Sequence, residues 1–309
     1  MNSMKTLMLL SALTALFMGL GYMLGGAGGA LIALVAAAAM NVFTFWNADK
    51  IVLRMHNARE MTKWDCPQFV GMIEQLSGRA GLPMPRVYLI DSPHPNAFAT
   101  GRDPANAAVA ATTGLLAILE REEIAAVMAH ELGHIRNRDT LIMTMTATIA
   151  GAISMLANFG FFFHSGERGN PLAMIGAIFL APFAAMILQL ALSRSREYGA
   201  DRAGAEICGN PRALASALAK LHKGTARVPS PIAERNPAVA ALYIVPSRSG
   251  RDSLFSTHPD TANRIAALQQ LAGEMGVRAP EPHRVRASVS PSRPRKTRTS
   301  ALDPLRKRP

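Results

Sequence analysis

Residues 122–134 read Glu-Glu-Ile-Ala-Ala-Val-Met-Ala-His-Glu-Leu-Gly-His. The apolar residues of this stretch recur at helical spacing, which predicts a helix with one buried face. Residues four apart lie one above the other on a helix, so His130 and His134 share a face. Two histidines in this arrangement can bind the same metal ion, and Glu131 can reach a water molecule beside it. The pattern His-Glu-x-x-His is typical of zinc hydrolases.

A third metal ligand is expected outside this helix, because zinc in a catalytic site usually has three protein ligands. Residues 193–201 read Ser-Arg-Ser-Arg-Glu-Tyr-Gly-Ala-Asp. Glu197 and Asp201 are four residues apart and therefore share a helix face. We predict Glu197 as the third ligand and Asp201 as the acceptor for the free N–H of a ligand histidine. Spacing alone leaves one alternative open, an exposed acidic pair among arginines.

The composition of the 309-residue chain is apolar and basic. Hydrophobic residues make up 49% and charged residues only 17%, whereas soluble domains have about 25% charged residues. These values exclude a disordered protein, a collagen and a coiled coil, and they argue against an ordinary soluble enzyme. The two cysteines, Cys66 and Cys208, are too few for a disulfide framework. We expect free thiols in a reducing compartment.

Four stretches contain no Asp, Glu, Lys or Arg and reach the roughly 20 residues that a membrane-spanning helix needs. They are Thr6–Leu24, Gly26–Trp46, Leu141–Phe163 and Pro171–Leu192. Short turns join the first stretch to the second and the third to the fourth, so we expect two helical hairpins. A cleavable signal peptide over residues 1–29 is the alternative for the first stretch. The second stretch follows at once, which favours an uncleaved hairpin.

Basic residues beside the four stretches predict their orientation. They precede the first and third stretches and follow the second and fourth: Lys5, Lys50, Arg54, Arg59, Lys63, Arg136, Arg138, Arg194 and Arg196. The two hairpin turns carry only Glu167 and Arg168. We therefore expect a multi-pass protein with both termini and the polar part on the cytoplasmic side. A transporter is disfavoured, because charged residues within the membrane usually mark a transport path and these stretches have none.

The polar part reads as a mixed α+β domain in two pieces. A helix is predicted at Pro67–Arg79, with a stop signal at Gly81, and another at Thr261–Leu271. Strands are predicted at Arg86–Ile90, Asn96–Thr100 and Ala107–Thr112. The expected segments are 1–46 (first hairpin), 47–140 (first piece of the polar domain), 141–192 (second hairpin), 193–277 (second piece) and 278–309 (tail). Residues 223–254 fit either a lid or a loose loop.

The tail is basic and rich in proline. Residues 278–309 contain ten Lys and Arg against two Asp and Glu, out of a net charge of +12 for the chain. No apolar periodicity accompanies these charges, so we expect a disordered extension that contacts anionic lipid. Nucleic acid is not an expected partner, since no aromatic residue interleaves with the basic ones.

Taken together, these motifs resemble the HtpX family of membrane-bound zinc metalloproteases, distant relatives of the CAAX prenyl proteases. The resemblance covers about residues 1–275 and is carried by five features. They are the first hairpin, Pro95–Gly101, His130–His134, Ser193–Asp201, and Phe255–Pro259 followed by Arg264. The resemblance implies a mainly α membrane protein with four transmembrane helices plus a cytoplasmic α+β gluzincin-type metalloprotease domain.

The resemblance also implies roles for individual residues. One Zn²⁺ per chain would be held by His130, His134 and Glu197, with Glu131 as general base and acid. Residues Asn96, Ala97, Phe98 and Ala99 are similar to the strand at the edge of the family's cleft. Such a strand pairs with an extended substrate through backbone hydrogen bonds. His258 and Arg264 resemble the pair that contacts the transition-state oxygen or the substrate.

The function implied by the resemblance is endopeptidase cleavage of misfolded or damaged membrane proteins. Its expected place is the cytoplasmic face of a bacterial inner membrane, in protein quality control and stress response. Two alternatives stay open, a CAAX-type prenyl-peptide protease and a non-proteolytic zinc-containing membrane scaffold. The first needs a large intramembrane chamber, for which four spans in a monomer are few. A protein side chain in the fourth coordination position of the zinc would favour the second.

Overall fold

The computed structural model describes residues 2–146, 148, 194–228, 230, 243–245 and 260–277. All of them belong to one compact unit, Met1–Val277. The predicted second hairpin, the predicted tail and His258 therefore lie wholly or mostly outside the described residues. Of residues 223–254, the structure describes the end of a helix up to Arg227, then Val228, Ser230 and the buried segment Tyr243–Val245.

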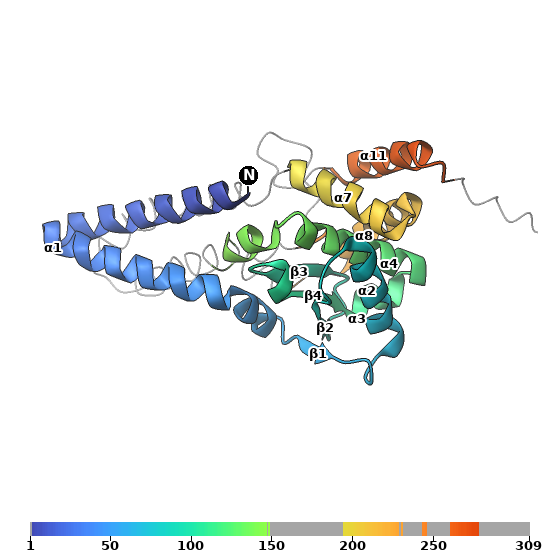
Figure 1. Cartoon of the computed structure of the whole chain (residues 1–309), viewed down its shortest axis with the longest axis horizontal. Helices are drawn as coiled ribbons and strands as arrows, with labels where there is room; N and C mark the ends of the chain where they lie inside the picture. Colours follow the sequence, from blue (N-terminus) through green and yellow to red (C-terminus); the bar gives the residue numbers. More distant parts are fainter. Residues whose placement is uncertain are drawn as a thin grey trace, which may run out of the picture. The chain divides into compact units, whose positions relative to one another are not determined.

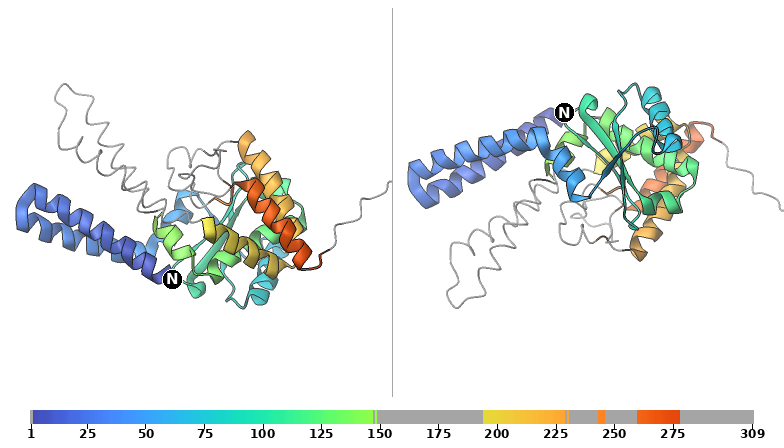
Figure 2. Two further views of the ribbon diagram at one scale, coloured as in Figure 1. Left: turned by 90° about the horizontal axis from the view of Figure 1, so that it is seen from above. Right: turned by 90° about the horizontal axis from the view of Figure 1, so that it is seen from below.

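Helix α1 (Asn2–Met55) forms a helical hairpin, as predicted. The chain reverses at Gly25 and Gly26, whose backbone angles are not helical, and both views of the molecule show α1 folding back on itself (Figures 1 and 2). Gly26 has φ 58° and ψ −146°, a conformation that glycine adopts easily because it has no Cβ. The two arms touch at Gly21 and Gly29, where a Cβ on Gly21 would lie 2.4 Å from the carbonyl oxygen of Gly29.

One described helix is long and apolar enough to cross a membrane, Gly25–Met55 in the second arm of α1. Its side chains Ile32, Val35 and Phe43 are exposed, as expected of a surface that faces lipid. This agrees with one of the four predicted membrane helices. The other three stay predictions.

The sheet is small and mixed, with strand order β1-β2-β4-β3. Its strands are β1 (Arg59–Met61), β2 (Arg86–Ile90), β3 (Ala97–Gly101) and β4 (Ala107–Thr112). The parallel pair is β2 with β4, while β1 and β3 each pair antiparallel with their neighbour. The strands predicted at 86–90 and 107–112 are confirmed, and β3 begins one residue later than predicted. Strand β1, with two charged residues among three, gave no strand signal and was not predicted.

Several further helices of the described part of the chain pack around the sheet. They are α2 (Pro67–Ala80), α3 (Thr113–Ile118), α4 (Arg121–Arg136), α7 (Arg194–Cys208), α8 (Pro211–Arg227) and α11 (Thr261–Glu274), with a short 3₁₀ turn at Pro104–Asn106. Helix α2 ends as predicted at Gly81, which has a left-handed φ of 66°. A buried core joins α2, the sheet, α4 and α8 through side chains such as Ile73, Val109, Leu132 and Leu218. The mainly helical fold with a small mixed sheet is thus confirmed.

Candidate metal centre

Helix α4 holds the predicted metal ligands on its buried face. It starts with a capping box, in which Glu120 and Glu123 each satisfy a backbone N–H of the other. Near the other end, His130 and His134 are 0% and 2% exposed. Their ring centroids are 4.8 Å apart, which is the arrangement that a spacing of four helical residues predicts.

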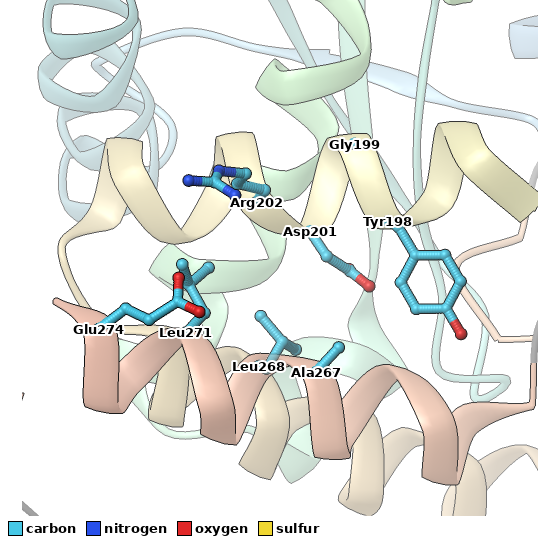
Figure 3. Close-up of a pocket in the computed structure, with 8 residues that line it drawn as sticks. All are labelled: Tyr198, Gly199, Asp201, Arg202, Ala267, Leu268, Leu271 and Glu274. Atoms are coloured by element: carbon cyan, nitrogen blue, oxygen red, sulfur yellow. The ribbon is translucent and has the colours of Figure 1, made fainter.

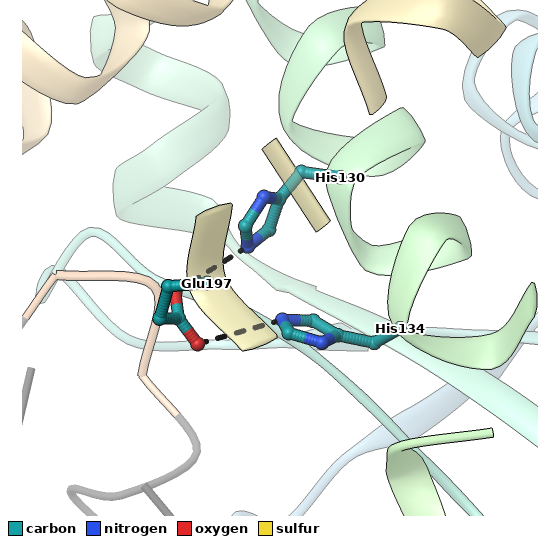
Figure 4. Close-up of side chains that lie close together, drawn as sticks. All are labelled: His130, His134 and Glu197. Atoms are coloured by element: carbon teal, nitrogen blue, oxygen red, sulfur yellow. Dashed lines mark ion pairs between the residues drawn. The ribbon is translucent and has the colours of Figure 1, made fainter. Parts of the chain in front are cut away.

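Glu197 of α7 completes a group of three. Its Oε2 lies 3.8 Å from Nε2 of His130, and its Oε1 lies 3.7 Å from Nε2 of His134 (Figure 4). All the ligand atoms lie within 4.8 Å of one another. We call His130, His134 and Glu197 the metal centre. The predicted alternative for Glu197, an exposed acidic residue, does not hold, because its side chain is buried.

The metal centre fits a zinc ion. The distances of 3.7 and 3.8 Å between nitrogen and oxygen are too long for hydrogen bonds. They leave room for an ion at the roughly 2.0–2.2 Å that zinc keeps from imidazole nitrogen and carboxylate oxygen. The buried Nε2 of His130 has no hydrogen-bond partner within the described part of the chain. A buried imidazole nitrogen that faces a carboxylate oxygen at this distance, without a hydrogen bond, indicates a cation site.

The close packing of α4 on α7 depends on two glycines. A Cβ on Gly204 would lie 2.7 Å from Cα of His130, and a Cβ on Gly133 would lie 3.0 Å from the carbonyl oxygen of Ala200. Both approaches involve backbone atoms, which cannot rotate away. The absence of side chains at these positions therefore lets Glu197 reach the two histidines.

Asp201, predicted to support a ligand histidine, lies beside the metal centre. Its Oδ1 lies 2.9 Å from Nδ1 of His130, so the opposite nitrogen of that ring faces Glu197. Burial raises the pKa of Asp201, but the charge and hydrogen bonds of Arg264, with the hydrogen bond of His130, outweigh it. They hold the pKa of this carboxyl well below its usual range. Asp201 is thus a charged group beside the imidazole of His130.

Arg264 of α11 is buried behind the metal centre, at 2% exposure. Its Nη1 donates to the carbonyl oxygen of Ile244 at 2.8 Å and lies 3.2 Å from Oε2 of Glu197. Two further hydrogen bonds join it to Asp201. These contacts orient both acidic residues. The predicted contact of Arg264 with a substrate stays a prediction, as does the role of its proposed partner His258.

Glu131 lies between the metal centre and the edge strand. Its pKa is raised to about 8, because burial and the charge of Glu197 raise it by more than the charge of His134 lowers it. A backbone hydrogen bond from Ala99 of β3 also reaches the Glu131 carboxylate. A carboxyl group with a pKa this close to neutrality can both take up and release a proton at physiological pH.

The predicted substrate strand lies at one edge of the described sheet, with its residues buried. Ala97, Phe98 and Ala99 belong to β3, which pairs only with β4 among the described strands. Asn96 precedes β3, and its Oδ1 accepts a hydrogen bond from the backbone N–H of Ile244 at 3.4 Å. The N–H of Ala99 points to Glu131. The edge of β3 that does not pair with β4 therefore faces Glu131.

Comparison with known proteins identifies the family. Residues 65–272 match the sequence model of Peptidase family M48. The chain belongs to this family. HtpX and Ste24 are members of it, which confirms the predicted relationship at family level. Among solved structures, the crystal structure of Ste24p from S. mikatae is similar, with 21% sequence identity and a TM-score of 0.48. The similarity covers 86% of this chain, which spans 65% of the length of that one.

Family M48 is a family of metallopeptidases, and its enzymes use zinc. Two imidazoles and one carboxylate agree with that metal. The M48 match also spans the residues at which the predicted second hairpin interrupts the domain.

The sequence did not predict that Asp139 lies beside the metal centre. Oδ2 of Asp139 lies 3.3 Å from Nδ1 of His134, although Asp139 stands in the turn after α4. The signal in the sequence is weak, an acidic residue five positions after the second histidine. A lone acidic residue beyond a helix end usually faces solvent.

A cavity of about 360 Å³ lies between α7 and α11 (Figure 3). Tyr198 and Arg202 line it from α7, and Leu271 and Glu274 line it from α11. Asp201 also lines this cavity, but the three metal ligands do not. The cavity is therefore separate from the place where a peptide would meet the metal.

Proposed function

We propose that this M48 protein is a membrane-integrated zinc endopeptidase that cleaves misfolded or damaged membrane proteins. The observation that carries the proposal is the buried group of His130, His134 and Glu197, with Glu131 beside it. Glu131 also contacts an edge strand. Metal ligands, a proton carrier and a strand edge are the three parts that peptide hydrolysis on an extended chain requires.

The proposed chemistry uses residues of the described structure. His130, His134 and Glu197 would hold the zinc ion, which when bound supplies a Lewis acid that lowers the pKa of water and polarises a carbonyl. Glu131 would accept a proton from the attacking water and deliver it to the leaving amine. His258 or Arg264 would help to stabilise the developing oxyanion.

The substrate would bind as an added strand on β3. Backbone groups of Ala97, Phe98 and Ala99 would pair with the extended peptide, while Asn96 fixes the start of the strand. Backbone pairing gives affinity with little dependence on side chains. Such tolerance suits a protease for damaged proteins, whose exposed segments have no common sequence.

The proposed architecture follows the HtpX pattern. Residues 1–46 and 141–192 would form two membrane hairpins, and 47–140 with 193–277 one metalloprotease domain. The basic flanks of the hairpins favour a cytoplasmic position for this domain and both termini. The resemblance to the HtpX family implies a bacterial inner membrane. The tail, 278–309, would contact anionic lipid. Extended loops of membrane proteins are then the polypeptides nearest to the site.

Cleavage of an unfolded model protein tests the proposal. The detergent-purified, zinc-loaded chain is compared with Glu131→Gln and with Glu122→Gln, which changes an exposed glutamate of the same helix. We expect cleavage by the wild type and by Glu122→Gln. Glu131→Gln should retain zinc and cleave nothing.

Other outcomes would change the assignment. Zinc bound at one equivalent without cleavage by any form would favour the non-proteolytic scaffold. Cleavage of a prenylated peptide alone would favour the CAAX-type protease. Cleavage retained by Glu131→Gln would remove Glu131 from the mechanism.

A further inference from the structure

Each histidine of the metal centre has its own buried aspartate. Asp201 Oδ1 lies 2.9 Å from Nδ1 of His130, and Asp139 Oδ2 lies 3.3 Å from Nδ1 of His134. The two aspartates are 3% and 2% exposed. In both rings the contacted nitrogen is Nδ1, and Nε2 is the nitrogen nearest Glu197. The two halves of the centre therefore have the same arrangement, although only one aspartate is on a helix.

The backbone after α4 turns so that Asp139 returns to His134. Helix α4 ends at Arg136, and Arg138 has a φ of 57°. This left-handed conformation is unfavourable for a residue with a Cβ. The N–H of Asp139 then donates to the carbonyl oxygen of His134 at 2.9 Å. The turn thus places the carboxylate beside the imidazole that precedes it by five residues, and such strained turns are found where function fixes a geometry.

An arginine lies near each aspartate as well. Arg264 binds Asp201 directly. On the other half, Arg196 is buried next to Glu197 in the sequence, at 7% exposure. Burial lowers the pKa of Arg196, while the charges of Asp139 and Glu197 act in the opposite direction. A buried cation therefore interacts with each half of the metal centre, Arg264 with Asp201 and Arg196 with Asp139 and Glu197.

We propose that Asp139 is a positioning residue of the metal centre, which accepts the Nδ1–H of His134 and so directs the lone pair of Nε2 to the metal. An imidazole without this acceptor could take the other tautomer or rotate about its side-chain bonds. Acceptors of this kind raise the basicity of a ligand histidine. The proposal rests on the proposed zinc function.

Zinc affinity tests this role without any assay of proteolysis. Full-length Asp139→Ala and Asp139→Asn are compared with the wild type by competition with a chromophoric chelator. We expect Asp139→Ala to weaken zinc binding about 10–100-fold, the usual effect of losing a ligand's hydrogen-bond partner. Asp139→Asn keeps a carbonyl oxygen as acceptor and should lose clearly less. The visible spectrum of the Co²⁺-loaded protein should change in Asp139→Ala and stay near that of the wild type in Asp139→Asn.

A control variant tests whether a loss of stability elsewhere in the protein is enough to weaken zinc binding. Asp260→Ala removes an exposed carboxylate that caps α11 by accepting from the N–H of Ala262 at 2.9 Å. It should lower the thermal stability and leave zinc affinity unchanged. Asp139→Asn has nearly the native shape, so it keeps the test available if Asp139→Ala does not fold.

Two negative results have different meanings. Wild-type zinc affinity and an unaltered Co²⁺ spectrum in Asp139→Ala would overturn the role of Asp139 and leave the proposed protease intact. A wild-type chain that binds no zinc would overturn the proposed function itself.

Discussion

Arg264 of α11 binds Asp201 of α7 with two parallel hydrogen bonds, Nε to Oδ2 at 2.8 Å and Nη2 to Oδ1 at 2.7 Å. Both side chains are buried. The same guanidinium lies 3.2 Å from Glu197, and Asp201 in turn contacts His130. A helix that carries no metal ligand is thereby connected to the metal centre. Arg264 thus supplies a positive charge to two buried carboxylates.

Replacing Arg264 by alanine should destabilise the protein strongly. The change leaves the carboxylate of Asp201 buried without the arginine that binds it, which typically costs about 3–5 kcal/mol. Urea unfolding of the zinc-free protein in detergent measures the loss. Arg202→Ala is the control, because it removes only an exposed pair with Glu206, at 3.4 Å. Its cost should be below about 1 kcal/mol. If both variants lost the same free energy of unfolding, the buried ion pair would stabilise the protein no more than the exposed pair does.

Gly204→Ala should disturb the metal centre through packing alone. The new Cβ would lie 2.7 Å from Cα of His130, so α7 must move away from α4. Overpacking of this kind costs about 1–3 kcal/mol, and zinc content should fall with it. Gly199→Ala, on the same helix, meets its nearest atom at an ordinary 3.7 Å. It should be neutral or stabilise the helix by up to about 1 kcal/mol. Full zinc content in Gly204→Ala would contradict this prediction.

Glu197→Ala should lower the zinc content of the purified protein. It removes one of three ligands from a site in which the remaining two are neighbouring histidines of one helix. Metal analysis after dialysis measures the effect. Glu206→Ala changes an exposed acidic residue of the same helix and should retain the wild-type content. An unchanged content in Glu197→Ala would place the third ligand elsewhere, with Asp201 as the first candidate.

Glu123 should make the stability depend on pH below neutrality. Burial raises its pKa, but hydrogen bonds from Lys220, Ser216 and the N–H of Glu120 lower it below its ordinary value of 4.5. A lowered pKa contributes stability above the unfolded-state value, and this contribution is lost as the pH falls through the folded-state value.

The measurement compares the free energy of unfolding of the wild type and Glu123→Gln. The difference should be about 1–3 kcal/mol at neutral pH, as for hydrogen bonds to a charged group. It should shrink as the pH falls below about 4.5. For Glu122→Gln, on the exposed side of α4, the difference should stay small throughout. A difference for Glu123→Gln that grows towards acid pH would contradict a lowered pKa of Glu123.

Features that depend on neighbouring residues could be predicted from the sequence. The spacing of His130 and His134 fixes their shared face, because helix geometry is local. The end of α2 at Gly81 and the strand Arg86–Ile90 follow from the same kind of signal, as they depend on a few consecutive residues. Helix α8 was missed although its start is marked by Asn210, which caps it through the N–H of Ala213, and by Pro211.

Other features needed contacts between distant residues. The spacing of Glu197 and Asp201 left an exposed pair open, and only the packing of α7 on α4 shows them buried beside the histidines. The position of β3 at the sheet edge depends on which strands pair, and that is not encoded in the strand itself.

The sequence by itself determined the helix with the two histidines, the apolar hairpin and the family, because each is written in residues close along the chain. Only the tertiary structure decided which carboxylates surround those histidines. Asp139 reaches His134 through a left-handed turn at Arg138, and Arg264 reaches Asp201 across 63 residues. Such contacts form when whole helices pack against one another. A polar group that becomes buried in this way needs a partner, and the packing decides which residue that is.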